Sequence, residues 1–368
     1  MKLLTVIGAR PQFIKAAPFS EKFRKGNEEI LVHTGQHYDA NMSDIFFDEL
    51  RIPKPEYNLG VGSGSHGKQT ASMLEGIEDI LLNEKPDGIL VYGDTNSTLA
   101  GALAASKLHV PVCHVEAGLR SYNKLMPEEQ NRILTDHISD LLLCPTQTAV
   151  DNLKREGITT GVVNTGDIMY DAVLRNIDIS NAKYSNGFWI DEIAQDNDEV
   201  IGSLTNGYYL ATIHRAENTD DEEKLSNIFQ AFSALDKPVL LPLHPRTKQL
   251  IKNLEIDMSN VIIIKPVGYL LMLYLTSNAY MVITDSGGLQ KEAYFLKTPC
   301  TTLRDQTEWI ETLDYSWNVL SDINVEEIID KVQRELVCVQ YLQNDAFGDG
   351  NAAAKICEAI KKGIKINE

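Results

Sequence analysis

Cysteine is scarce in this sequence, and its few cysteines are widely separated. They are odd in number and form no C-x-x-C pair: Cys113, Cys144, Cys300, Cys338 and Cys357. This pattern gives no zinc site and no disulfide framework. It predicts buried free thiols in a reducing cytoplasm.

Long apolar runs and an excess of positive charge are also missing. The apolar stretches are only strand-sized, so we expect no transmembrane span. Met1-Lys2 leads directly into one of them, which leaves no room for a signal peptide. The formal net charge of −18 argues against general binding to nucleic acid or to a membrane surface, since both are polyanionic. Local Arg and Lys residues can still bind a nucleotide.

What the sequence does contain is a regular alternation of short apolar runs and helical stretches. Its 368 residues, of which 43% are hydrophobic and 23% charged, predict a globular protein of two domains. Near-continuous apolar character within each run is typical of parallel strands buried on both faces. We therefore predict an α/β fold of two doubly wound, Rossmann-like domains facing a cleft, with a boundary near residues 166–176. The expected strands are Leu3–Gly8, Ile30–Thr34, Gly88–Gly93, Val110–Val115, Leu141–Pro145, Val162–Thr165, Tyr208–Ile213, Val239–Leu243, Val261–Ile264, Tyr280–Thr284 and Pro299–Leu303.

The most informative segment is a strand that runs into Ser286-Gly287-Gly288 and then into a helix. Backbone N–H groups and the macrodipole at such a helix start favour a phosphate, and glycine lets it approach the backbone. Glu292 follows about one turn later, where its carboxylate could accept hydrogen bonds from two ribose hydroxyls. The alternative is an ordinary N-capped helix after a turn.

The first strand also ends in a helix start with cations, Arg10 and Lys15, around Pro11. Two cations beside a helix N-terminus suggest a phosphate clamp, and the alternative is a solvated basic helix start. By contrast, Gly62, Gly64 and Gly67 fit the G-x-G-x-x-G pattern but follow a stretch, 54–60, that we interpret as loop. No βαβ unit surrounds them, so we do not predict a dinucleotide site there.

Carboxylates and histidines follow several other strands. Asp94 and Glu116 each end an apolar strand, where desolvation can make a carboxyl a usable acid or base. The alternative for each is an N-cap or turn residue. His214 follows the first strand of the second domain, and His244 ends the next one. Either could be catalytic, although a lone histidine is more often structural.

Two further segments contain charged residues that are candidates for a functional role. Glu128, Asn131 and Arg132 share one helix face, and the alternative to a functional role is a weak surface ion pair between Glu128 and Arg132. Arg304 ends the strand that contains Cys300, and it could reach a ligand or pair with Asp305.

Together these segments resemble the non-hydrolysing UDP-N-acetylglucosamine 2-epimerase family from Met1 to the C-terminal helix. The resemblance rests on ordered matches at residues 8–11 with Lys15, 93–95, 114–120, 127–132, 214–215, 285–288 and 304–308. It implies a glycosyltransferase-B-like architecture, in which residues 1–170 and a C-terminal helix at about 352–368 form one domain. Residues 171–351 would form the second, UDP-binding domain.

The resemblance also implies roles for individual residues. The diphosphate would be bound by Ser286, Gly287 and Gly288, the ribose by Glu292, and the phosphates or sugar region by Arg10, Lys15, Arg132 and Arg304. The acid and base positions would be Asp94, Glu116, Glu128 and His214. A second UDP-N-acetylglucosamine activates bacterial members, and the positions that match its contacts are Gln36, His37, Lys68, Gln69 and His244.

The chemistry of the family explains why several acids are needed. The C2 proton of an acetamido sugar is only weakly acidic, so a base removes it while UDP leaves C1, which gives a 2-acetamidoglucal. Protonation of C2 from the opposite face and return of UDP give the other epimer. No cofactor or metal is required. The resemblance further implies a homodimer in nucleotide-sugar and polysaccharide biosynthesis, with neither nucleic acid nor membrane as a partner.

Two departures affect which sugar is expected. Trp309-Ile310-Glu311 replaces the Arg-Pro-Glu of better-known members, and Lys291 replaces an acidic residue beside Glu292. These features are similar to the branch that acts on UDP-2,3-diacetamido-2,3-dideoxy-glucuronate. A lysine would suit an added carboxylate, or Lys291 would simply face solvent. The rival functions are a glycosyltransferase of the same architecture and a non-catalytic UDP-sugar sensor.

Overall fold

The computed structural model describes residues 1–36, 50, 52–187, 189, 193, 204, 207–243, 251, 257–336 and 345–364. The chain divides into two compact units. The first unit is Met1–Leu174 with Asp345–Glu368, and the second unit is Arg175–Asn344. The division falls inside helix α7 (Ile168–Tyr184). No helix in these described ranges is long and apolar enough to cross a membrane.

The described part of the first unit is built on a seven-stranded sheet, in which neighbouring strands pair in parallel. Its strand order is β3-β2-β1-β4-β5-β6-β7. All six strands expected here are present. The bounds are β1 (Lys2–Ile7), β2 (Glu28–His33), β3 (Tyr57–Asn58), β4 (Gly88–Tyr92), β5 (Val112–Val115), β6 (Leu141–Cys144) and β7 (Val162–Asn164).

One expectation for this sheet was wrong. Residues 54–60 were interpreted as loop, but they contain the edge strand β3, whose Tyr57 pairs with Val32 of β2. A two-residue strand beside Pro55 has no alternation to detect, so its pairing is set by the neighbouring strand.

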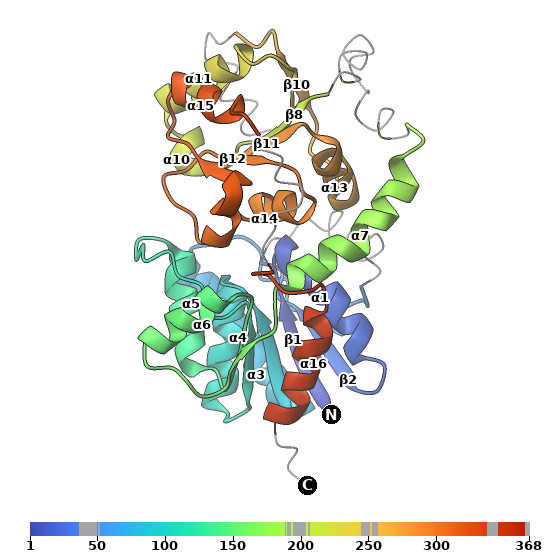
Figure 1. The fold of residues 1–368 in the computed structure, drawn as a ribbon. Coiled ribbons are helices and arrows are strands. Elements are labelled where there is room, and N and C mark those ends of the chain that lie inside the picture. The colour runs from blue at the N-terminus through green and yellow to red at the C-terminus, as the bar shows by residue number, and fades with distance from the viewer. Residues whose placement is uncertain are drawn as a thin grey trace. The chain divides into compact units, whose positions relative to one another are not determined.

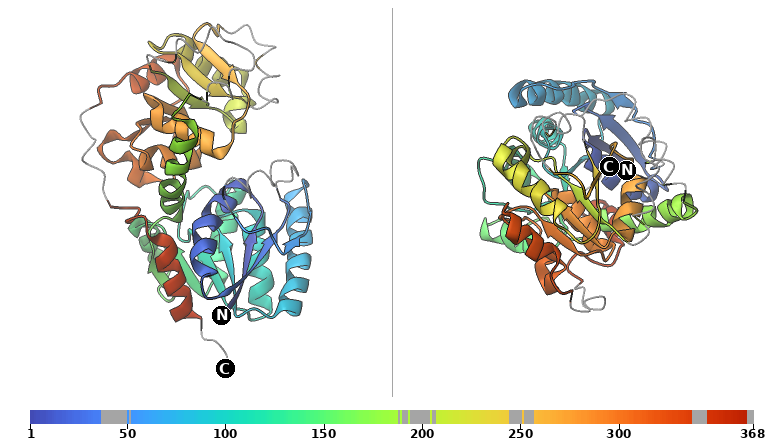
Figure 2. Two further views of the ribbon diagram at one scale, coloured as in Figure 1. Left: turned by 90° about the vertical axis from the view of Figure 1, so that its right-hand side faces the viewer. Right: turned by 90° about the horizontal axis from the view of Figure 1, so that it is seen from above.

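Helices cover both faces of the first sheet (Figure 2, left). The C-terminal helix α16, red in Figure 1, returns to this unit and packs beside the blue α1. Asp171 of α7 fixes the start of α16 by accepting hydrogen bonds from the backbone N–H groups of Ala352 and Ala353, both at 2.9 Å. The helices are α1 (Arg10–Phe23), α3 (His66–Glu84), α4 (Asn96–Lys107), α5 (Pro127–Ile138), α6 (Gln147–Arg155) and α16 (Ala352–Gly363).

The second unit repeats this plan. Its described strands form a six-stranded parallel sheet of order β10-β9-β8-β11-β12-β13. The edge strand β13 was not expected from the sequence. The bounds are β8 (Tyr209–Thr212), β9 (Val239–Pro242), β10 (Val261–Ile264), β11 (Met281–Thr284), β12 (Cys300–Thr302) and β13 (Asn318–Leu320), with α10 (Ala216–Thr219), α11 (Glu222–Ser233), α13 (Tyr269–Asn278), α14 (Gly287–Phe295), the 3-10 segment η1 (Ile310–Ser316) and α15 (Val325–Val332).

Both sheets reverse their strand order beside their first strand. In the first unit the reversal lies between β1 and β4, and in the second it lies between β8 and β11. The chain therefore diverges there, and open α/β sheets bind ligands at such points, outside the carboxyl ends of the strands. The predicted α/β class with two doubly wound sheets is confirmed.

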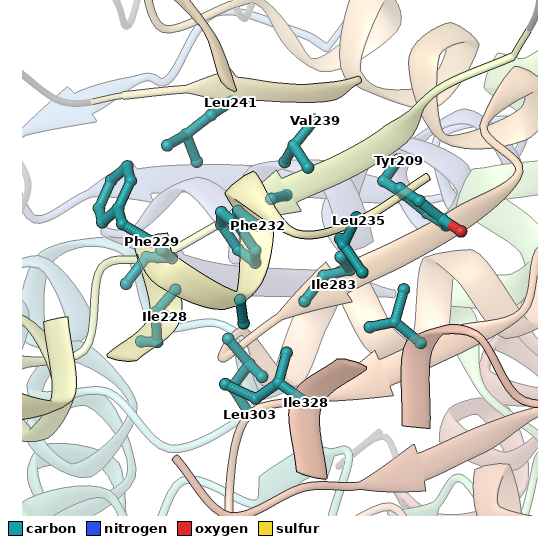
Figure 3. Close-up of a cluster of buried hydrophobic side chains, with 14 of the residues drawn as sticks. Tyr209, Ile228, Phe229, Phe232, Leu235, Val239, Leu241, Ile283, Leu303 and Ile328 are labelled. Atoms are coloured by element: carbon teal, nitrogen blue, oxygen red, sulfur yellow. The ribbon is translucent and has the colours of Figure 1, made fainter. Parts of the chain in front are cut away.

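The core of the second unit shows what stabilises these layers. Figure 3 shows side chains of α11, among them Ile228, Phe229 and Phe232, packed against residues of the sheet. Phe229 and Phe232 are fully buried. Burial of such aromatic side chains contributes about 2 to 3 kcal/mol each.

We expect Phe229→Ala to lower the free energy of unfolding by about 3 to 5 kcal/mol, because it removes a ring from a close-packed core. Urea unfolding would measure this change. Gln230→Ala is the matched control, since Gln230 is the next residue of α11 and is exposed. It should alter the free energy by no more than about 0.5 kcal/mol. Equal losses in the two variants would contradict the assignment of this face of α11 to the core.

Candidate functional site

Gln12 joins the two turns that flank the switch point of the first unit. Its Oε1 accepts hydrogen bonds from the backbone N–H groups of Gly8 (2.8 Å) and Ala9 (3.0 Å), in the turn between β1 and α1. Its Nε2 donates to the Tyr92 carbonyl (2.8 Å) and to Thr95 Oγ1 (2.9 Å), around the turn between β4 and α4. The start of α1, where Arg10 lies, is thereby tied to the turn that contains Asp94.

Lys15 and Glu116 form a buried ion pair at this point. Each side chain is 8% exposed, so the alternative of a solvated basic helix start is wrong for Lys15. Gly93 lies against the pair. A Cβ built on Gly93 would lie 3.2 Å from Glu116 Oε2 and 3.6 Å from Lys15 Nζ, and its φ of +64° favours glycine.

Asp94 pairs with Arg132 of α5, and its carbonyl accepts a hydrogen bond from Asn131 Nδ2 at 2.9 Å. Arg132 is buried and also pairs with Glu129 at 3.0 Å. Arg132 therefore pairs with Asp94 and Glu129, and not with Glu128 in a surface ion pair. Nor is Asp94 the N-cap of α4, because Thr95 has that position. Glu128 is exposed in the first turn of α5, one turn before Arg132.

The turn that carries Glu116 has a strained backbone. Glu116 has a φ of +72°, an uncommon value for a residue with a side chain, and such strain is often found at functional sites. The Leu143 carbonyl accepts hydrogen bonds from the N–H groups of Glu116 (3.0 Å) and Ala117 (3.3 Å). Neighbouring β6 thus holds this turn in place.

A buried polar network supports the same turn. Asp136 of α5 accepts hydrogen bonds from Gly118 N (3.1 Å) and Arg120 Nη1 (2.7 Å), and its Oδ1 lies 2.7 Å from His114 Nδ1. Arg120 also donates to both oxygens of Glu156, from Nε at 2.6 Å and from Nη2 at 2.7 Å. Burial acts to raise the pKa of the Asp136 carboxyl, but the bonds to His114 and Arg120 outweigh it and hold the pKa below its usual value.

This lowered pKa predicts an effect of pH on stability. A carboxyl with a depressed folded-state pKa stabilises the fold above its unfolded value of 3.8, and this stabilisation is lost as pH falls through the folded pKa. We expect Asp136→Asn to lower the free energy of unfolding most at neutral pH, and the difference from wild type to shrink in strong acid. Urea unfolding at several pH values would measure it. Gln130→Ala, an exposed change on α5, is the control and should keep the wild-type pH dependence. A wild-type minus Asp136→Asn difference that did not vary with pH would contradict the assignment.

In the second unit, Asp285 organises the segment after β8. This fully buried carboxylate accepts hydrogen bonds from the N–H groups of His214 (3.1 Å) and Arg215 (3.0 Å) and from Asn218 Nδ2 (3.2 Å). It also lies 3.1 Å from His214 Nδ1. The His214 side chain is 56% exposed, so one ring edge is oriented by Asp285 while the ring remains accessible.

The Ser286-Gly287-Gly288 segment begins α14, as predicted. Ser286 is the N-cap, and its Oγ accepts a hydrogen bond from Leu289 N at 3.3 Å. A Cβ on Gly287 would lie only 2.6 Å from Glu308 Oε1, so this carboxylate lies against the helix start. Glu308 is also the ion-pair partner of Arg304, at 3.1 Å. The sequence had offered Asp305 for that role.

Glu292 and Lys291, farther along α14, are both buried. The Lys291 ammonium lies over the ring of Trp309, 3.5 Å from its centroid. The alternative that Lys291 faces solvent is therefore wrong, because Trp309 covers its ammonium group. The two departures from the family pattern form a cation–π pair with each other.

The candidate activator positions lie in the first unit where they are described. Gln36 Oε1 accepts hydrogen bonds from Ser97 N (3.0 Å) and Ser97 Oγ (2.7 Å). Gln69 Nε2 donates to the Gly62 carbonyl at 2.8 Å, and its Oε1 accepts from Asn96 Nδ2 at 2.8 Å. Lys68 is exposed. His37 and His244 lie outside the described residues.

Three residues that organise these turns were not predicted. Asp285 directly follows a strand, the same signal that identified Asp94. Asp136 lies four residues after Arg132, so it shares the helix face of Glu128 and Arg132. Gln12 had no such signal, because its side chain acts on a turn 80 residues away in the sequence.

Comparisons with known proteins place nearly the whole chain in one group. A sequence profile of a family described as UDP-N-acetylglucosamine 2-epimerase matches residues 21–361. A Methanococcus maripaludis protein described as a UDP-N-acetylglucosamine 2-epimerase homolog is 51% identical over 98% of this chain and 99% of its own. The UDP-2,3-diacetamido-2,3-dideoxy-D-glucuronate 2-epimerase of Pseudomonas aeruginosa is 49% identical over 98% of this chain and 100% of its own.

A solved structure extends this similarity to the fold. The crystal structure of Methanocaldococcus jannaschii UDP-GlcNAc 2-epimerase in complex with UDP-GlcNAc and UDP matches with a TM-score of 0.84 at 42% identity. The match covers 98% of this chain and 100% of that chain.

Proposed function

The chain belongs to the UDP-N-acetylglucosamine 2-epimerase family, as its motifs predicted, and we propose that it inverts C2 of a UDP-2-acetamido sugar. It is an isomerase of the non-hydrolysing type. The observation that carries the assignment of its site is the pair of acids Asp94 and Glu116. They follow the neighbouring strands β4 and β5, and each is paired with a cation.

The reaction is an elimination followed by a re-addition. A carboxylate removes the C2 proton while the bond between C1 and the UDP oxygen breaks. This leaves a C1=C2 double bond in the sugar and UDP that is no longer bonded to it. An acid then protonates C2 from the other face, and the UDP oxygen attacks C1 again. The first step needs a base at C2 and the second needs an acid on the other face. We assign these proton transfers to the group Asp94, Glu116, Glu128 and His214.

UDP must stay bound while it is detached. We assign its diphosphate to the N-terminus of α14, at Ser286, Gly287 and Gly288, with Arg304 nearby. Glu292 on the same helix would bind the ribose. The cations Arg10, Lys15 and Arg132 belong to the proposed sugar and phosphate region, where they would stabilise charge on the leaving group.

The sugar is either N-acetylglucosamine or the 2,3-diacetamido-uronate. Similar relatives carry both names, so identity alone does not choose between them. Lys291 would suit the added carboxylate of the diacetamido-uronate, but its ammonium group is covered by the indole ring of Trp309. Turnover of the two UDP-sugars, compared at equal concentration, would identify the preferred substrate.

Proton exchange tests the function directly. Incubation with UDP-N-acetylglucosamine, or with the diacetamido-uronate analogue, in D2O should place deuterium at C2 in both epimers without any acceptor. A glycosyltransferase would need an acceptor and leave C2 unlabelled, and a sensor would bind UDP-sugar without exchange. If neither UDP-sugar is labelled at C2, the proposal is wrong.

Assembly, location and regulation are proposed with the function. We infer a homodimer and a cytoplasmic enzyme; the four described cysteines are free and buried, as the reducing compartment would favour. Light scattering would test the dimer. If Gln36 and Gln69 bind a second UDP-sugar, the rate should depend sigmoidally on the concentration of UDP-N-acetylglucosamine. Gln69→Ala should then make this dependence hyperbolic.

A further inference from the structure

His114 connects the two turns that carry the proposed acids. It lies on β5, fully buried, two residues before Glu116. Its Nε2 lies 2.7 Å from the carbonyl oxygen of Gly93, and its Nδ1 lies 2.7 Å from Asp136 Oδ1. The Gly93 carbonyl belongs to the peptide bond that joins Gly93 to Asp94. The ring therefore contacts the peptide plane from which Asp94 extends.

Both contacts of His114 are with acceptors. A backbone carbonyl can only accept a hydrogen bond, and so can an ionised carboxylate. Asp136 is ionised, since its pKa is held below the usual value. Each ring nitrogen therefore faces an acceptor to which it can donate a hydrogen bond.

Asp136 in turn fixes the turn of Glu116. Its Oδ2 accepts from Gly118 N and from Arg120 Nη1, which lie two and four residues after Glu116. One end of the network thus holds the peptide before Asp94, and the other holds the turn after Glu116. This network adds a side-chain link to the backbone hydrogen bond from Gly93 N to the Val115 carbonyl (3.0 Å), which already joins the two strand ends.

We propose that His114 is a positioning residue for the epimerisation: by donating to the Gly93 carbonyl and to Asp136, it sets the orientation of Asp94 relative to Glu116. This inference rests on the proposed function, because it requires Asp94 to act on the sugar. Misplacement of a reacting group by about 1 Å can cost about a hundredfold in rate, which is the scale of effect expected here.

Two substitutions of His114 each keep one of the two hydrogen bonds of the ring and remove the other. The side-chain amide of His114→Gln can reach the position of Nε2 and still donate to Gly93, whereas that of His114→Asn mimics Nδ1 and donates only to Asp136. We expect His114→Asn to lower kcat by about a hundredfold while KM and UDP affinity remain near wild type. His114→Gln should keep most of kcat, although both variants lose one buried hydrogen bond and melt at lower temperatures.

The comparison of kcat with melting temperature decides between positioning and simple stabilisation. If both variants lose kcat equally, or in proportion to their loss of melting temperature, the positioning role is wrong. As a further check, adding His114→Asn to Asp94→Asn should cause little additional loss, because both changes act on the same group. Failure of wild-type protein to label C2 in D2O would instead refute the proposed function, so the two failures are distinguishable.

Discussion

Glu116→Gln should abolish nearly all C2 exchange while UDP still binds. Glutamine keeps the size of the side chain and the same cost for the backbone φ of +72°, but it can no longer take up or deliver the proton. General acid–base groups contribute about 10²- to 10⁴-fold to rate, so we expect kcat to fall about a thousandfold. Deuterium incorporation at C2 measures this step, and calorimetry measures UDP affinity.

The controls for this prediction separate chemistry from folding. Glu75→Gln makes the same change at an exposed position of α3 and should keep wild-type kcat. Glu116→Asp keeps the charge but withdraws the carboxylate from Lys15, so it should retain more activity than Glu116→Gln. Asp94→Asn should also lower kcat by orders of magnitude. Wild-type rates in Glu116→Gln would remove Glu116 from the mechanism.

The sequence predicted the architecture well because its signals are local. Each central strand is a short apolar run buried on both faces, so β4 or β11 can be recognised without knowledge of its partners. The edge strands β3 and β13 carry two and three residues, and only their pairing with β2 and β12 identifies them. Their formation depends on tertiary context, which a single sequence does not display.

The positions of candidate site residues were predictable for a related reason. The carboxyl ends of parallel strands meet at one edge of the sheet, so recognising the two strands was enough to expect Asp94 and Glu116 at the same edge. That β4 and β5 are neighbours is seen only in the structure. Partner choice was not predictable. Arg132 has acids within reach along its own helix, but it also pairs with Asp94, 38 residues away, and the burial of the guanidinium decides this. The same holds for Gln12, Asp136 and His114, whose roles depend on contacts across the sheet.

Gly288→Ala should weaken UDP binding without weakening the fold. A Cβ on Gly288 would meet only Ser286 Oγ, at 3.9 Å, which is ordinary contact. Alanine is favoured over glycine in helices by up to about 1 kcal/mol, so the melting temperature should hold or rise. Gly287→Ala is a poorer test, because its methyl group would collide with Glu308 and disturb the partner of Arg304.

The expected loss comes from the phosphate, not from the fold. If the diphosphate approaches the N-terminus of α14, the added methyl group holds it away from the backbone N–H groups. Hydrogen bonds to charged groups contribute about 1.5 to 3 kcal/mol, so UDP affinity should fall at least about tenfold. Uridine carries no phosphate, so its weaker affinity should be unchanged. Gly26→Ala, at an exposed position with open space around it, is the control and should leave both affinities at wild-type values. An unchanged affinity for UDP in Gly288→Ala would mean that the diphosphate binds elsewhere, and an equal loss for uridine would mean that the methyl group disturbs the nucleoside site instead.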